Sequence, residues 1–207
     1  ILQDNDTCCR RLSSSKTNVE KLGMATVGQG KSVLDNHKMQ IYLLYQTEWL
    51  ATGSGYDDKI GALWVNPSTC KPVGSTIGHE IGHSFQYQVS ADKLFTGEVT
   101  PIDKADGSQL VPAGFRYGFG ENGAGGCAYW EQCAQWQSFQ DYPNECFDQD
   151  AHYAVWLKNH HRHFNHEFMR YASYWFQYWF TEKHGIESYA RIWKESKYPE
   201  DPLQTYM

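Results

Sequence analysis

The alternation of apolar and polar residues predicts strands early in the chain and helices after them. Two short runs rich in β-branched and aromatic residues, at 38–46 and 60–65, have the character of strands. The segment between them contains ATGSGYDD at 51–58, whose glycines are typical of a turn. We therefore expect 38–46 and 60–65 to be neighbours in one sheet.

The segment 75–89 has the period of an amphipathic helix. Its N-terminus carries Ser75 and Thr76, whose side chains are suited to capping. An apolar residue then recurs at every fourth position, which predicts one buried stripe. The stripe consists of Ile77, Ile81, Phe85 and Val89.

Two more helices are expected, at 127–140 and at 165–184, and the second ends at Gly185, a typical stop residue. Most of the remaining glycine and proline lies in 91–126 and 141–150, which we expect to be irregular. The fold class is therefore predicted to be α+β. A sheet and one helix form the upper part, about residues 1–90, and a mostly helical lower part follows, about residues 91–207.

Composition limits the functions to consider. The chain has 207 residues, of which 41% are hydrophobic, so it can bury one substantial core, and we expect a single domain and a monomer. Its net charge is −6 and it has no basic run, which argues against nucleic acid as a partner. No apolar run approaches the roughly 20 residues that a membrane span requires.

The start of the chain and its cysteines bear on localisation. It begins at Ile1 without an initiator methionine, as a mature exported protein or a piece of a longer chain would. The six cysteines allow up to three disulfides, whose pairing the sequence does not fix. We expect a protein that is secreted, on the cell surface or in the periplasm.

The helix at 75–89 contains the pattern HExxH. Residues four apart stand one above the other on a helix, so the imidazoles of His79 and His83 can bind one metal ion. Neutral imidazole suits Zn²⁺, and a third protein ligand would leave one position open for catalysis. Glu80 would then be the general base that takes a proton from the attacking water. Gly78 and Gly82 are poor helix formers, and we expect close packing to require them.

A third ligand must come from elsewhere in the chain. The metzincin pattern requires xxGxxH after His83, and SFQYQVS follows instead, so that branch is excluded. Two glutamates remain, Glu131 on the predicted helix 127–140 and Glu98 in the loop-like FTGEVTP. We favour Glu131, because a ligand on a rigid helix is held better than one on a loop.

The stretch GHEIGHSFQYQ, followed later by YWEQCAQW, resembles the gluzincin branch of zinc metallopeptidases over about residues 38–195. The resemblance implies a zincin-like fold and hydrolysis of peptide bonds in a protein, peptide or glycoprotein. It also implies that His79, His83 and Glu131 are zinc ligands and Glu80 the catalytic base. Thermolysin-like members place an acidic residue where this chain has Gln135, whose amide oxygen could still accept the imidazole N–H.

Two alternatives remain open. The spacing of GHEIGH and TGEVT resembles the enhancin-like, mucin-targeting gluzincins, in which Glu98 would be the third ligand. The chain could also be a gluzincin-fold module that binds protein or glycan without turnover, although the intact Glu80 favours an enzyme.

Peptide hydrolysis also requires a hydrogen-bond donor for the oxyanion. The cluster NHHRHFNHEFMRY at 159–171 offers several histidines and a tyrosine, and of these we favour His166 and Tyr171. His163 and His166 could alternatively hold a second metal ion.

Overall fold

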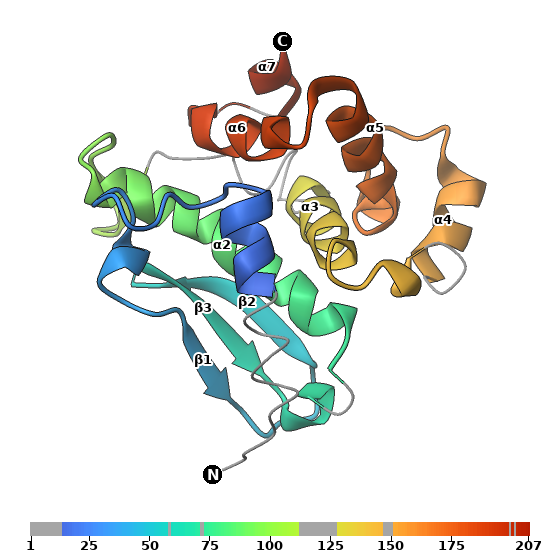
Figure 1. Ribbon diagram of the computed structural model, residues 1–207, viewed down its shortest axis with the longest axis horizontal. Helices are drawn as coiled ribbons and strands as arrows, with labels where there is room; N and C mark the ends of the chain where they lie inside the picture. The colour runs from blue at the N-terminus through green and yellow to red at the C-terminus, as the bar shows by residue number, and fades with distance from the viewer. Residues whose placement is uncertain are drawn as a thin grey trace.

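The computed structural model has the expected α+β architecture, with a small sheet under a layer of helices (Figure 1). It describes residues 14–57, 59–70, 73–111, 128–146, 151–198, 200 and 202–207. No helix in these ranges is long and apolar enough to cross a membrane.

The sheet has three strands, β1 (Gln40–Leu43), β2 (Ala51–Tyr56) and β3 (Ile60–Val65). The strand order is β1-β3-β2, with β3 parallel to β1 and antiparallel to β2. The pairing of the first and third strands confirms the prediction. The glycine-rich segment was wrongly predicted as a turn, because most of it forms the outer strand β2.

Close packing explains glycine in this strand. A Cβ atom on Gly53 would lie 2.0 Å from the carbonyl oxygen of Glu80, on the long helix that crosses the sheet. No side chain fits at that distance, so the glycine lets a strand approach the helix backbone directly. The local composition of this segment predicts a turn. Only the contact between Gly53 and the backbone of the long helix explains why glycine lies in a strand here.

The long helix is α2 (Ser75–Phe95). Its predicted stripe of Ile77, Ile81, Phe85 and Val89 is buried, with at most 7% of each residue exposed. The helix extends beyond the predicted end at residue 89 and ends at Phe95. At its start, the main-chain N–H of Ser75 donates to the carboxylate of Glu145 at 2.9 Å. A carboxylate is favourable there, because it meets both the unpaired N–H groups and the positive end of the helix dipole.

The helix α3 (Ala128–Phe139) packs along α2, close to the predicted range 127–140. Two glycines of α2 face it. A Cβ on Gly82 would lie 3.2 Å from the Cα of Ala134, and one on Gly78 would lie 3.3 Å from the Cα of Ser138. The expectation that close packing requires these glycines is confirmed, since any larger side chain would push the two helices apart.

The predicted helix 165–184 is interrupted. The structure has two short 3-10 turns, η7 (Glu167–Met169) and η8 (Ala172–Tyr174), before the helix α5 (Trp175–His184), which ends at Gly185 as predicted. The physical reason lies at His166, which has an extended backbone and whose Nδ1 accepts the N–H of Phe168. This side-chain cap starts a tight turn in place of a continuous helix.

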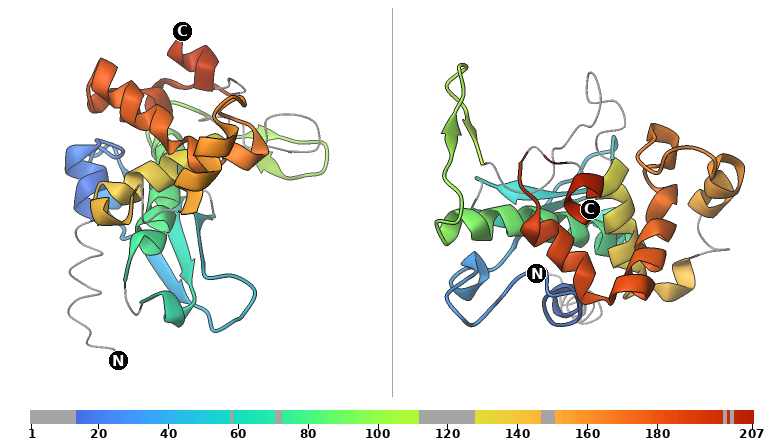
Figure 2. Two further views of the ribbon diagram at one scale, coloured as in Figure 1. Left: turned by 90° about the vertical axis from the view of Figure 1, so that its right-hand side faces the viewer. Right: turned by 90° about the horizontal axis from the view of Figure 1, so that it is seen from above.

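The other elements are shorter or peripheral. The hairpin of β4 and β5 projects from the helical layer, and α4 lies at the edge of that layer (Figures 1 and 2). Their bounds are η1 (Thr17–Lys21), η2 (Val33–Asp35), η3 (Pro67–Cys70), β4 (Ile102–Asp103), β5 (Gln109–Leu110), η5 (Pro143–Glu145), α4 (Ala151–Asn159), α6 (Glu187–Glu195) and α7 (Pro202–Tyr206). The sequence analysis did not anticipate α4 or this hairpin.

Three of the six cysteines fall in the described ranges, and all three are free thiols. Cys133 and Cys146 are buried and Cys70 is partly exposed. The other three, Cys8, Cys9 and Cys127, lie outside the described residues. Three intramolecular disulfides would need all six cysteines, so the structure does not support that arrangement.

Candidate metal centre

Two histidines of α2 and one glutamate of α3 converge on one point between the helices. Nε2 of His79 lies 2.9 Å from Oε2 of Glu131, and Nε2 of His83 lies 3.1 Å from the same oxygen. The three potential ligand atoms all lie within 4.8 Å of one another, so one metal ion could contact all of them. Only 9%, 12% and 15% of the His79, His83 and Glu131 side chains is exposed.

The helix geometry explains this convergence. His79 and His83 are one turn apart and project from the same face of α2, with ring centroids 4.7 Å apart. Glu131 lies in the first turn of α3, which Gly78 and Gly82 allow to pack closely against that face. The structure therefore brings together the three residues that the sequence analysis selected as metal ligands.

A hydrogen bond orients each imidazole from behind. Nδ1 of His79 lies 2.9 Å from Oε1 of Gln135, and Nδ1 of His83 lies 2.9 Å from Oε1 of Gln86. An amide oxygen can only accept, so each contact is a hydrogen bond when Nδ1 carries the proton, and in a neutral ring Nε2 then has a free lone pair. Gln135 thus has the expected position, with its amide oxygen at hydrogen-bond distance from a histidine nitrogen.

The donor set fits a cation. Two Nε2 lone pairs and a carboxylate oxygen face one another at hydrogen-bond distance, and such acceptors repel unless a proton or a metal ion lies between them. Two imidazoles and one carboxylate form a common ligand set for a catalytic metal, and they leave room for a further ligand. The buried His79, His83 and Glu131 group could thus bind a metal ion.

Charge coupling in the group shifts two pKa values. Burial alone would raise the pKa of Glu131, but hydrogen bonds and charge interactions with His79 and His83 outweigh it and hold this pKa far below its usual range. Burial alone would lower the pKa of His83, but the hydrogen bond and charge of Glu131, with the charge of Glu80, raise it. Without a metal, the site therefore favours a carboxylate beside an imidazolium.

Glu80 follows His79 directly and is oriented by the sheet. Its Oε2 accepts the main-chain N–H of Gly53 at 2.6 Å. Because β2 is an outer strand, one side of its backbone is not paired with β3, and Gly53 can turn its N–H to the carboxylate. The strand thus fixes a charged group next to the two histidines.

Of the two predicted oxyanion donors, Tyr171 has a ring contact with the metal group. The Tyr171 ring centroid is 5.9 Å from that of His79. Behind it, the ring of His152 on α4 stacks at 4.9 Å, and the guanidinium of Arg170 lies 4.9 Å from the Tyr171 centroid. The sequence analysis missed His152, because no pattern connects it with the HExxH helix.

His166 has a different role. Its Nδ1 caps the turn η7, and its Nε2 lies 3.1 Å from Nη1 of Arg162. A neutral imidazole has a single acceptor nitrogen, which here accepts the Phe168 N–H, so His166 has a structural role as a cap. That it also donates to the oxyanion stays a prediction. Among the described residues, His79, His83 and Glu131 form the only group of three or more potential metal ligands, so no such group surrounds His163 and His166.

The alternative third ligand lies at the far end of α2. Glu98 follows the helix, is 61% exposed, and its Oε1 lies 3.6 Å from Nζ of Lys93. At 1.5 Å per residue, the twelve residues from His83 to the helix end at Phe95 span about 18 Å. The structure therefore places Glu131, and not Glu98, beside the two histidines.

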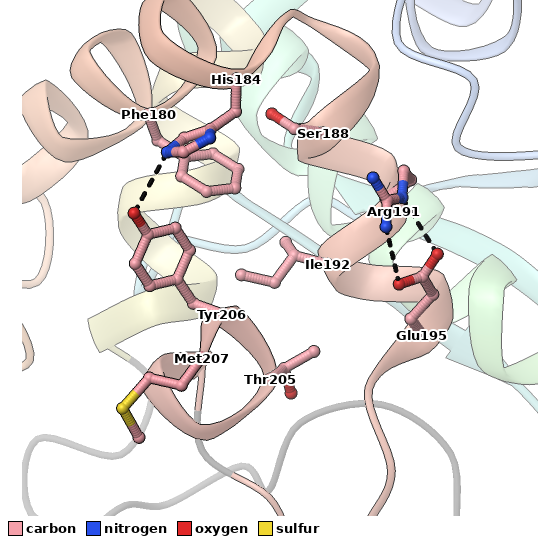
Figure 3. A pocket seen from close by; sticks show the side chains of 9 residues that line it. All are labelled: Phe180, His184, Ser188, Arg191, Ile192, Glu195, Thr205, Tyr206 and Met207. Atoms are coloured by element: carbon pink, nitrogen blue, oxygen red, sulfur yellow. Dashed lines mark hydrogen bonds and ion pairs between the residues drawn. The ribbon is translucent and has the colours of Figure 1, made fainter.

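A separate cavity lies between α5, α6 and α7 and has a volume of about 410 Å³ (Figure 3). Four of its polar side chains pair with one another. Nε2 of His184 lies 3.1 Å from the hydroxyl of Tyr206, and Arg191 forms an ion pair with Glu195. None of the metal-group residues lines it, so it is not part of the candidate centre.

Comparisons with known proteins give one match. No curated protein matches the chain. No solved structure matches it either. A model of a family of unknown function, DUF6055, matches residues 6–207, nearly the full length. The chain therefore belongs to the DUF6055 family.

Proposed function

We propose that this chain is a zinc-dependent peptidase of the gluzincin type. In this proposal His79, His83 and Glu131 hold Zn²⁺, and Glu80 is the general base. The single observation that carries it is the convergence of both HExxH imidazoles and a glutamate from a second helix on one nearly buried point. That arrangement supports the resemblance in the sequence motifs.

The choice of zinc rests on the donor set. Two imidazole nitrogens and one carboxylate suit a borderline metal such as Zn²⁺ better than Ca²⁺ or Mg²⁺, which prefer oxygen ligands. The single negative charge leaves the occupied site with a net positive charge. When bound, zinc would acidify a water molecule and polarise the carbonyl of the substrate.

Glu80 has the position and the orientation of a general base. It takes a proton from the attacking water and delivers it to the leaving amine as the peptide bond breaks. The hydrogen bond from Gly53 holds one of its carboxylate oxygens and restricts the rotation of the other. This restriction keeps the base in place without a metal bond to it.

Tyr171 is the proposed oxyanion donor. Its ring lies beside that of His79, and His152 and Arg170 pack against it. A phenol hydroxyl at this position would donate to the oxygen on which negative charge develops during attack on the carbonyl. This proposal replaces the pair of His166 and Tyr171 with Tyr171 alone.

An extended peptide is the substrate that the sheet accommodates best. Among the described strands β2 is an outer one and contacts Glu80 through Gly53, and an outer strand can pair with an extended segment on the side away from its neighbour. A peptide lying there would pass the metal group. We propose a protein, peptide or glycoprotein substrate, a secreted or surface location and a monomeric enzyme.

The proposal is tested by digesting a broad peptide library with zinc-loaded protein, with the chelator-treated protein as control. We expect cleavage products only from the zinc-loaded sample. If this sample binds zinc and cleaves no peptide, the peptidase proposal fails and a binding module without turnover becomes the better account.

A further inference from the structure

A chain of side-chain amides runs from His83 into the core. Nδ1 of His83 lies 2.9 Å from Oε1 of Gln86. Nε2 of Gln86 donates in turn to the main-chain oxygen of Trp130 at 3.1 Å and to Oε1 of Gln137 at 3.0 Å. Gln86 and Gln137 are each only 1% exposed, so water does not compete for these groups.

The amide chain continues to the start of the described structure. Nε2 of Gln137 donates to Oδ1 of Asn18 at 2.5 Å, and Nδ2 of Asn18 donates to the main-chain oxygen of Ser14 at 2.9 Å. Asn18 is also 1% exposed. A segment 119 residues away in sequence from Gln137 therefore takes part in a hydrogen-bond network that ends at a potential metal ligand.

Two main-chain carbonyls fix the direction of this network. A carbonyl oxygen can only accept a hydrogen bond. The side-chain amide that faces the oxygen of Ser14 or of Trp130 must therefore present its N–H group and not its oxygen. If Gln86 were turned over, its oxygen would face the oxygens of Trp130 and Gln137, two buried repulsions in place of two hydrogen bonds. Gln86 must therefore present its oxygen to His83.

The fixed direction matters because a competing acceptor lies on the other side of the ring. Oε2 of Glu131, 3.1 Å from Nε2 of His83, would accept a proton from that nitrogen. A neutral imidazole carries one N–H, so Gln86 and Glu131 compete for it. A proton on Nε2 would occupy the position that a metal ion needs.

We propose that Gln86 is a positioning residue that keeps the proton of neutral His83 on Nδ1 and thereby leaves Nε2 free for the metal. The consequence for metal binding rests on the proposed zinc site, whereas the proton position is a property of the metal-free protein. Gln135 orients His79 in a similar way, but Gln86 is the residue whose direction the buried amide network determines.

The proton position can be measured by ¹⁵N nuclear magnetic resonance of the histidine rings. The sample is full-length protein with chelator present, at a pH high enough to make His83 neutral. We expect the proton on Nδ1 in the wild type and on Nε2 in Gln86→Met, which removes the acceptor. A proton on Nε2 in the wild type would overturn the proposal, even if the variant does not fold.

Zinc affinity provides the second readout, measured by competition with a chelator of known affinity. Gln86→Met should bind zinc about 10 to 100-fold more weakly, the usual loss when a partner behind a ligand is removed. Gln88→Met is the matched control, a buried glutamine of α2 that bonds Gly61 and Asp92 instead. Equal loss in both variants would mean that Gln86 acts only through stability. If the wild type binds no zinc, the proposed function fails, but the proton measurement still decides this inference.

Discussion

The main-chain N–H of Gly53 donates a 2.6 Å hydrogen bond to the carboxylate of Glu80, so the outer strand of the sheet holds the side chain proposed as the base. The same residue lies against the backbone of α2, where a Cβ atom would be 2.0 Å from the Glu80 carbonyl oxygen. Strand, helix and base are thus connected at one glycine.

Gly53→Ala should therefore disturb both stability and activity. The added methyl group must displace the strand from the helix, which we expect to lower the free energy of unfolding by about 1–3 kcal/mol, as overpacking does. Urea denaturation measures the loss, and peptide hydrolysis should fall with it. Gly55→Ala is the matched control on the same strand, because its Cβ would be 3.4 Å from the nearest atom, an ordinary contact. Equal destabilisation by both substitutions would contradict this explanation.

The two candidate third ligands can be separated by substitution. Glu131→Ala removes a carboxylate 2.9 Å and 3.1 Å from the histidine nitrogens and should weaken zinc binding by far more than the roughly 100-fold limit of an indirect effect. Glu98→Ala should leave zinc affinity unchanged, because it removes only an ion pair with Lys93 at the far end of α2. Competition with a chelator measures both. Release of zinc by Glu98→Ala alone would reverse the assignment.

Removal of one hydroxyl tests the oxyanion donor. Tyr171→Phe keeps the ring beside His79 and should lower kcat/KM by about 100 to 1000-fold, with zinc content unchanged. His166→Ala is the control from the same segment. It should remove the cap of η7, which lowers the free energy of unfolding by about 1 kcal/mol, and leave kcat/KM close to the wild-type value. The opposite order of effects on kcat/KM would favour His166 as the donor.

The shifted pKa values predict how pH affects the metal-free protein. Because the pKa of Glu131 is lowered in the folded state, its carboxylate stabilises the fold at pH values above the ordinary pKa of 4.5. This stabilisation is lost as the pH falls toward the folded-state pKa. Because the pKa of His83 is raised in the folded state, its imidazolium stabilises the fold at pH values below the ordinary pKa of 6.5. This stabilisation is lost as the pH rises through the folded-state pKa.

The pair should therefore stabilise the metal-free protein most between about pH 4.5 and 6.5. Denaturation of wild type and Glu131→Gln within this range and on both sides of it measures the contribution as the difference between them, which should fall at lower and at higher pH. Zinc affinity should instead rise with pH, because the metal must displace the proton on the histidine. A stability difference that does not vary with pH would contradict the coupling.

Several parts of the site were predictable because they depend on local periodicity. The spacing of His79 and His83 placed them on one helix face, and the buried stripe of α2 located that helix. Glu131 followed from a second helical segment of suitable length. These residues point where the helix geometry directs them, so a correct helix assignment was sufficient.

The rest depends on contacts that local sequence does not contain. The strand β2 has the composition of a turn, and only its approach to Glu80 explains Gly53. The helix predicted at 165–184 breaks because the side chain of His166 competes for a backbone N–H. Gln86 lies one turn after His83 and could have been noticed, but its direction depends on Gln137 and Asn18.

The most direct measurement is the zinc content of purified protein after mild zinc loading, determined by elemental analysis for the wild type and two variants. The account predicts about one zinc per chain in the wild type and in Glu80→Gln, because Glu80 is not a ligand, and none in His79→Ala. Glu80→Gln should also lose peptide hydrolysis. A wild-type protein without zinc, or equal zinc loss in both variants, would contradict the account.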